Sequence, residues 1–296
     1  MGNAPTFIIS SMAANTWPDF NDLWDYNDPA ATEAKFRELL AGAAAQDQDY
    51  TLQLKTQIAR TFSLRGEFDE AHKLLDEVEA DMPANSLVEV RYLLERGRAF
   101  NSERQAEKAV LLFSRASALA EKLGADFFTV DALHMLGVAA PKKARLDWNL
   151  KAIEVAQDSA DERARGWLAS LYNNTGWTLF DEGRHAEALD LFQKALPLRE
   201  EKGEAEPLRV AKWSVAKALR VLGRVEEALA IQRRLETLEG DPSGFTLEEI
   251  GECLLALDQP AEARPYFARA YEKLRSIDWV AEDSARIEHI RQLAGA

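Results

Sequence analysis

The sequence of 296 residues is 47% hydrophobic and 29% charged, a balance that provides a substantial core and excludes a generally disordered chain. Its 36 basic and 50 acidic residues give a formal net charge of −14, which argues against nucleic acids and anionic membranes as partners, since both would repel it. Cys253 is the only cysteine, so no disulfide forms within the chain, and we expect a reducing, cytoplasmic environment.

The first 28 residues form a segment of their own, rich in acidic and aromatic side chains. Its start contains a short apolar run without a preceding basic residue, which makes a poor secretory signal. Its second half reads WPDFNDLWDYND and contains no basic residue. Asp28 followed by Pro29 is typical of a helix start, with Asp as the cap and Pro in the first turn. We therefore expect a capping helix over residues 29–51, which covers one end of the structure that follows.

Over residues 52–275 the sequence repeats one two-helix pattern six times. The clearest copy spans residues 170–203. Gly176 lies within its first helix, where the missing side chain lets a neighbouring helix approach closely. Gly183 supplies a turn that residues with a Cβ resist. The second helix then carries a stripe of small, large and small side chains, namely Ala188, Phe192 and Ala195.

The other copies keep this order of residues. The first position of the stripe recurs every 35 to 40 residues, and its occupants are Ala71, Ala109, Asn149, Ala188, Ala228 and Ala263. The third copy is the weakest, because it has Asn149 in place of alanine and Pro141 in the turn. A proline at that position predicts that the first helix ends near Ala140.

This pattern resembles the tetratricopeptide repeat, in which a large residue, a small one, an aromatic one and a turn glycine are followed by Ala, Phe and Ala. The resemblance implies an all-α fold, a right-handed α–α superhelix of about six helical hairpins, with the first helices on its concave side and a C-terminal capping helix over residues 276–296. Repeats of this family have about 34 residues. The longer ones here resemble those of kinesin light chains and of bacterial peptide-pheromone receptors, which bind peptides. The run LWDYNDPAATEAKFRELL is also similar to uncharacterised bacterial members of the family.

Motifs of catalysis and metal binding are missing from the sequence. The histidines are scattered, and neither H-E-x-x-H nor a Cys/His cluster with zinc spacing, a P-loop or G-x-S-x-G occurs. Cys253 has no base near it in the pattern, so we interpret it as a packing residue. We expect no cofactor, no metal and no enzymatic activity. An enzyme with a dispersed, all-helical active site is the alternative.

The resemblance and the spacing together predict a binding groove on the concave side. Counting from the small residue of each first helix, the positions six and three before it and one, four and five after it face away from the second helix. In the first two repeats these positions hold three arginines and no acid. The residues that we expect to bind a peptide are Arg60, Arg91, Arg98, Asn101, Asn173, Trp177, Trp213, Lys217 and Arg220.

These side chains suit a protein or peptide partner with acidic and apolar side chains. Arginines bind carboxylates through paired hydrogen bonds, asparagines bond a peptide backbone, and tryptophans hold apolar side chains. The leading hypothesis is therefore a non-enzymatic scaffold or adaptor that binds a partner segment in the groove. A second hypothesis makes residues 1–28 the occupant of the groove, in the same molecule or in a second copy, which would give a homo-oligomer. The alternative is that this segment packs on the first helices.

Overall fold

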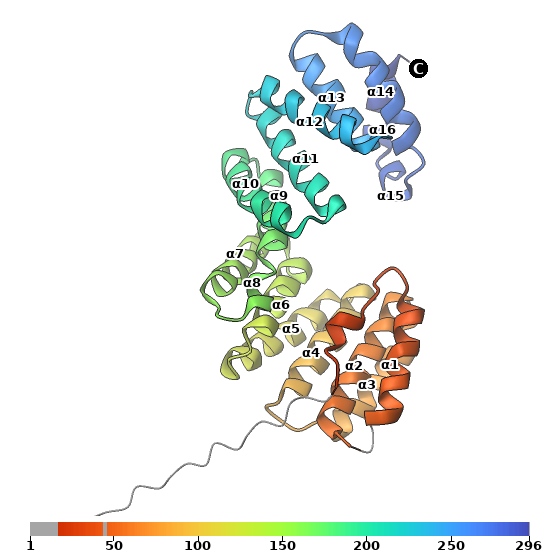
Figure 1. The fold of residues 1–296 in the computed structure, drawn as a ribbon, viewed down its shortest axis with the longest axis vertical. Helices are drawn as coiled ribbons and strands as arrows, with labels where there is room; N and C mark the ends of the chain where they lie inside the picture. The colour runs from red at the N-terminus through yellow and green to blue at the C-terminus, as the bar shows by residue number, and fades with distance from the viewer. Residues whose placement is uncertain (1–16, 44–45, 296) are drawn as a thin grey trace, which may run out of the picture. The chain divides into compact units, whose positions relative to one another are not determined.

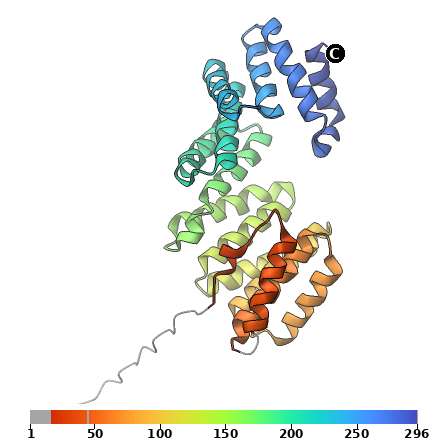
Figure 2. The same ribbon diagram turned by 45° about the vertical axis from the view of Figure 1, so that its right-hand side comes forward.

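The computed structural model describes residues 17–43 and 46–295, and within these ranges every regular element is a helix (Figure 1). The predicted all-α fold is confirmed. The described helices include six hairpins, in each of which a first and a second helix lie side by side (Figures 1 and 2). These hairpins are α2 (Gln48–Leu64) with α3 (Phe68–Asp81), α4 (Leu87–Ser102) with α5 (Ala106–Lys122), α6 (Asp126–Ala139) with α7 (Lys142–Asp158), α9 (Leu168–Asp181) with α10 (His185–Lys202), α11 (Ala205–Val221) with α12 (Val225–Glu239), and α13 (Gly244–Ala256) with α14 (Pro260–Leu274).

Further helices lie before, between and after the hairpins. The 3-10 helix η1 (Phe20–Leu23) and α1 (Pro29–Ala43) precede them, α8 (Glu162–Arg165) follows α7, and α15 (Asp278–Ala281) and α16 (Ser284–Ala294) follow α14. Residues 1–16 of the predicted N-terminal segment lie outside the described residues. None of the described helices is both long enough and apolar enough to cross a membrane.

The chain divides into two compact units, unit 1 ending at Gly124 and unit 2 beginning at Ala125. In unit 1, α1 packs on α2, and α2 packs on both α3 and α4, which brings two first helices into direct contact. In unit 2, three second helices each pack on two first helices: α7 on α6 and α9, α10 on α9 and α11, and α12 on α11 and α13. The last hairpin is covered by α16, which packs on α14.

Glycine in the first helix lets a phenylalanine of the second helix lie against the backbone. A Cβ at Gly176 would come within 2.5 Å of Phe192, and one at Gly97 within 2.5 Å of Phe113. The predicted role of Gly176 is therefore confirmed, because alanine at this position would push the two helices of the hairpin apart. In the third hairpin the amide of the buried Asn149 fills the space above Gly137, which explains why asparagine is accepted in place of alanine.

The N-terminal helices differ in extent from those predicted. Asp28 caps α1 as expected, since its side chain accepts a hydrogen bond from a backbone N–H at 2.9 Å. However, α1 ends at Ala43 instead of residue 51. Asp47 begins the next helix by accepting a hydrogen bond from the Tyr50 N–H at 2.9 Å, so that the first hairpin begins at residue 48 instead of 52.

Two predicted helix ends are confirmed in unit 2. Gly183, after α9, has a φ of +79°, a conformation that a Cβ disfavours. The helix before Pro141 ends at Ala139, because proline restricts the residue that precedes it to extended conformations.

Candidate functional site

The predicted site residues lie on the first helices of the hairpins, at the positions that the helical spacing assigns to one side of each helix. We call this side the first-helix face. In unit 1 it is formed by α2 and α4, and in unit 2 by α9, α11 and α13. The predicted residues divide accordingly: Arg60, Arg91, Arg98 and Asn101 lie in unit 1, and Asn173, Trp177, Trp213, Lys217 and Arg220 lie in unit 2.

A buried carboxylate neutralises two arginines of unit 1. Glu95 is 3% exposed, and its Oε1 accepts a hydrogen bond from Arg98 at 2.6 Å. The same oxygen lies 3.6 Å from the guanidinium of Arg60 on the neighbouring first helix. The counted positions hold no acid, but the neighbouring Glu95 adds one to this face. Glu95 lies two residues before Gly97, at a helical position that adjoins the counted ones, so a wider count along the sequence would find it.

Arg91 is buried instead of exposed on the first-helix face. Its Nε donates a hydrogen bond to the side-chain oxygen of Gln53 at 2.9 Å, and its guanidinium lies 4.9 Å from the centre of the Phe20 ring. Asn101, near the C-terminal end of α4, is partly exposed. The first-helix face of unit 1 is thus less open and less basic than the sequence predicted.

Residues 17–28, which we call the N-terminal strap, pack against α1 and α2 (Figures 1 and 2). Trp24 donates a hydrogen bond from Nε1 to the side-chain oxygen of Gln57 at 3.1 Å. The rings of Trp24 and Tyr26 stack with their centres 4.9 Å apart, and the guanidinium of Arg60 lies 5.4 and 5.3 Å from these two centres. The described part of the N-terminal segment therefore packs on the first helices, and its rings cover cations that we predicted to bind a peptide.

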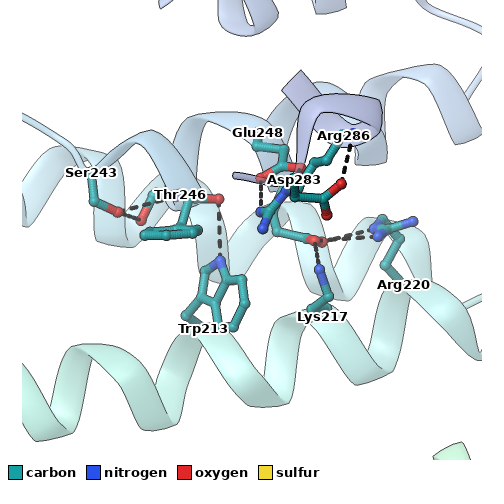
Figure 3. Close-up of polar contacts among 10 residues, drawn as sticks. Trp213, Lys217, Arg220, Ser243, Thr246, Glu248, Asp283 and Arg286 are labelled. Carbon is teal, nitrogen blue, oxygen red and sulfur yellow. Dashed lines mark hydrogen bonds and ion pairs between the residues drawn. The ribbon is translucent and has the colours of Figure 1, made fainter. Parts of the chain in front are cut away.

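A row of four aromatic rings crosses the first-helix face of unit 2; we call Trp177, Phe180, Trp213 and Phe245 the aromatic row. The ring centres of Trp177 lie 5.2 Å from those of Phe180 and 5.5 Å from those of Trp213. Trp213 lies 6.1 Å from Phe245 and donates from Nε1 to the Phe245 carbonyl at 3.2 Å (Figure 3). All four side chains are partly exposed, and they come from three successive first helices. The structure thus brings the two predicted tryptophans together.

The predicted cations of unit 2 share one buried carboxylate. Glu249 is 1% exposed and accepts hydrogen bonds from Lys217 at 2.7 Å and from the Arg220 Nε at 2.8 Å (Figure 3). Burial opposes the ionisation of Glu249, but the charges and hydrogen bonds of these two cations outweigh it and hold its pKa below the usual value. Like Glu95, it lies two residues before the small residue of its helix, Gly251.

The first-helix face of unit 2 ends at the C-terminal helix. Arg286 of α16 pairs with the buried Glu248, its Nε donating at 3.1 Å, and its guanidinium lies 5.4 Å from the centre of the Phe245 ring (Figure 3). Asp283 caps α16 by accepting from the Arg286 N–H at 3.1 Å. The sequence predicted a capping helix here but gave no role to Arg286, because its partner lies 38 residues earlier in the chain.

Nothing in the described residues arranges groups for catalysis by a thiol or a metal. Cys253 is buried, and this burial raises the pKa of its thiol to about 12, so it is a poor nucleophile at neutral pH. No group of three or more His, Cys, Asp and Glu side chains in the described part of the chain is placed to hold a metal ion. The first-helix faces instead carry aromatic rings, amides and paired charges.

The chain is similar to tetratricopeptide repeat proteins in sequence. Residues 168–202, which include α9 and α10, match the family model described as tetratricopeptide repeat. This match covers all but the last residue of the copy that was clearest in the sequence, residues 170–203. No protein among the curated sequences compared with the chain matches it.

Solved structures resemble the chain in fold. The apo form of RapI is 14% identical and has a TM-score of 0.72, with 94% of this chain and 81% of that chain covered. BtubC (BKLC) from P. vanneervenii is 17% identical and has a TM-score of 0.58, with 73% of this chain and 92% of that chain covered. NprR in complex with its cognate peptide NprX is 14% identical with a TM-score of 0.51, covering 92% and 81%. Together with the family model, these likenesses confirm the predicted tetratricopeptide repeat fold.

Proposed function

We propose that this tetratricopeptide repeat protein is a non-enzymatic receptor or adaptor, which binds a peptide segment of a partner protein on the first-helix face of unit 2. The observation that carries the proposal is the aromatic row, which continues over three first helices with partly exposed rings. Tryptophan and other aromatic side chains are frequent anchors of interfaces, because they give a large contact area for few rotatable bonds. A row that crosses successive helices suits a peptide that runs across them.

The ion pairs decide which side chains the partner contributes. Lys217 and Arg220 already bind Glu249, so an acidic side chain of the partner would compete with a carboxylate that both cations hold. We therefore propose apolar or aromatic side chains as the main anchors of the partner, with acidic side chains at the rim. Asn173, one helical turn before Trp177, donates to the Asn174 side chain at 3.3 Å and accepts from the Ser214 hydroxyl at 3.5 Å, so a peptide backbone would have to exchange with these bonds.

Two further observations support a binding role. The fold is similar to that of NprR, whose structure was solved with its cognate peptide. The high pKa of Cys253 and the missing catalytic motifs favour binding over catalysis. With a single, buried cysteine, the protein is proposed to act in the reducing environment of the cytoplasm.

The test is a selection of peptides from a random library on the full-length protein, followed by affinity measurements on variants. Trp177→Ala and Trp213→Ala are each expected to lower the affinity for the selected peptides by about tenfold or more, as substitutions of a central interface anchor do. Trp213→Phe keeps an aromatic ring, so its affinity for the peptides is expected to fall less than that of Trp213→Ala. Leu238→Ala, at a side chain on α12 that is 75% exposed, is the matched control and should bind as the wild type does.

Melting temperatures of all variants accompany the measurement, because Trp177 also packs 5.1 Å from the buried Phe192 ring. The proposal fails if the alanine variants keep both the wild-type melting temperature and the wild-type affinity for the selected peptides.

A further inference from the structure

We infer that the first-helix face of unit 1 is a second peptide site, that the N-terminal strap is its built-in occupant, and that an aromatic, acidic segment of a partner protein displaces the strap. The inference concerns unit 1 and stands independently of the function proposed for unit 2. It rests on the side chains that hold the strap, on buried polar atoms that the strap leaves without a partner, and on the composition of the strap.

Side-chain contacts that another peptide could repeat hold the strap on α2 and α4. Trp24 gives one hydrogen bond to Gln57, and Arg60 lies over the rings of Trp24 and Tyr26. The Phe20 ring lies over Arg91. Each of these contacts needs an aromatic side chain at the right place, and none needs the chain connection to α1. Cation–π contacts of this kind recur wherever an arginine meets an aromatic face.

The strap leaves two buried polar atoms unsatisfied. Among the described residues, Arg60 Nε and Glu95 Oε2 are buried without a hydrogen-bond partner. Arg60 is the residue that the two rings cover, and Glu95 is its ion-pair partner. A ring face offers Arg60 no in-plane acceptor, whereas a peptide backbone presents both a carbonyl for Nε and an N–H for the carboxylate oxygen. A partner peptide that meets both atoms gains hydrogen bonds that the strap does not make.

The sequence of the strap also indicates which side chains a partner segment needs in order to displace it. Its aromatic residues at the first-helix face are spaced by four and then two positions, at Phe20, Trp24 and Tyr26. Four aspartates lie between or beside them in the sequence, and three arginines of α2 and α4, of which Arg91 is buried, outnumber Glu95 there. A ligand must refill the place of the buried Phe20 ring, which packs with Tyr50 at 4.7 Å, so a peptide without aromatic side chains cannot compete.

A labelled peptide with the sequence of residues 17–28 is the probe for this site. The full-length variant Trp24→Ala, whose own strap is loosened, is expected to bind the probe about tenfold more tightly than the wild type, since the fraction of open sites sets the apparent affinity. A probe with alanine at the position of Trp24 should not bind. Adding Arg60→Ala to Trp24→Ala should abolish the gain in affinity for the probe. Adding Trp213→Ala instead should leave this gain unchanged, which separates the result from the function proposed for unit 2.

Hydrogen exchange on the wild type tests the same displacement without any mutation. Excess probe is expected to speed exchange of the backbone amides of residues 19–28. Equal binding of the probe to wild type and a folded Trp24→Ala variant, together with unchanged exchange, overturns the inference. A concentration-dependent dimer of the wild type that Trp24→Ala abolishes also overturns it, because the strap would then be exchanged between two copies of this chain. Tyr26→Ala, at a side chain that is 56% exposed, replaces Trp24→Ala if that variant does not fold.

Discussion

Glu249 carries its charge in a nearly closed environment because Lys217 and Arg220 bond both of its oxygens. Removing one partner of such a buried group costs more than the pair contributes as a whole, since the remaining charges lose their counterion. The pKa of Glu249 is held low by these two cations against the effect of burial, and this shift ties the stability of unit 2 to pH.

Glu249→Gln is expected to lower the free energy of unfolding by about 1–3 kcal/mol at neutral pH. The folded-state pKa lies below the usual 4.5, so ionisation of Glu249 stabilises the wild type fully above pH 4.5, and this contribution is lost as the pH falls through the folded-state pKa. The difference between wild type and variant should therefore shrink toward acid pH. Urea unfolding at several pH values between about 3 and 7 measures it. A difference that grows toward acid pH would contradict this account.

Gln232, unlike Glu249, is a buried polar residue without partners among the described residues. Its amide N and O both lack a hydrogen-bond partner within these residues. It lies four residues after Ala228, the position that phenylalanine fills in three other hairpins at Phe113, Phe192 and Phe267. In the first hairpin the small residue is alanine, Ala59, and leucine fills the equivalent position. The fifth hairpin also has alanine, Ala216, which indicates that leucine fits there too.

Gln232→Leu is expected to raise the free energy of unfolding by about 1–3 kcal/mol, because it replaces two unsatisfied polar atoms with apolar ones of similar volume. The matched control is Leu75→Gln in the first hairpin, which should lower stability by a similar amount. Thermal and urea unfolding of both variants measure the effect. A Gln232→Leu variant that is less stable than the wild type would show that the side-chain amide of Gln232 does have a hydrogen-bond partner.

In five of the six described hairpins, the turn between the two helices uses one left-handed residue, two positions after the last residue of the first helix. Gly66, Gly183 and Gly223 fill this position with φ of +76°, +79° and +81°. Arg104 and Asp258 occupy the equivalent position in the second and sixth hairpins with φ of +64° and +59°. A side chain in this conformation costs free energy that glycine avoids.

Arg104→Gly is expected to stabilise unit 1 by about 0.5–1 kcal/mol, because the relief of backbone strain exceeds the added flexibility of the unfolded chain. Gly183→Ala in the fourth hairpin is the reverse change and should destabilise by a similar amount. Urea unfolding compares the two. Equal stability of Arg104→Gly and wild type would mean that the arginine side chain offsets its strain.

The hairpins were predictable from the sequence, whereas the charge pairs across them were not. Gly176 and Phe192 are close in sequence and repeat in kind along the chain, so a local pattern reports their contact. Glu248 and Arg286 meet across 38 residues, one on a first helix of a hairpin and the other on the C-terminal helix α16, and no repeat relates them. Such partners depend on how neighbouring helices pack, and composition alone cannot assign them.

The two units present first-helix faces of different character. In unit 1 the N-terminal strap covers Arg60 and Arg91, and the face is closed by the chain itself. In unit 2 the aromatic row is partly exposed, and the cations beside it are neutralised by Glu249. Because the aromatic row is partly exposed whereas the strap covers the arginines of unit 1, we propose that a partner can bind unit 2 without displacing a segment of the chain.

The most direct test uses ¹⁹F NMR of the full-length protein labelled with 5-fluorotryptophan, with each resonance assigned by a Trp→Phe substitution. A peptide selected on the protein is titrated in. The account predicts that the resonances of Trp177 and Trp213 shift together as the peptide binds, while that of Trp148 on α7 does not move. Saturating binding that leaves Trp177 and Trp213 unshifted would contradict it.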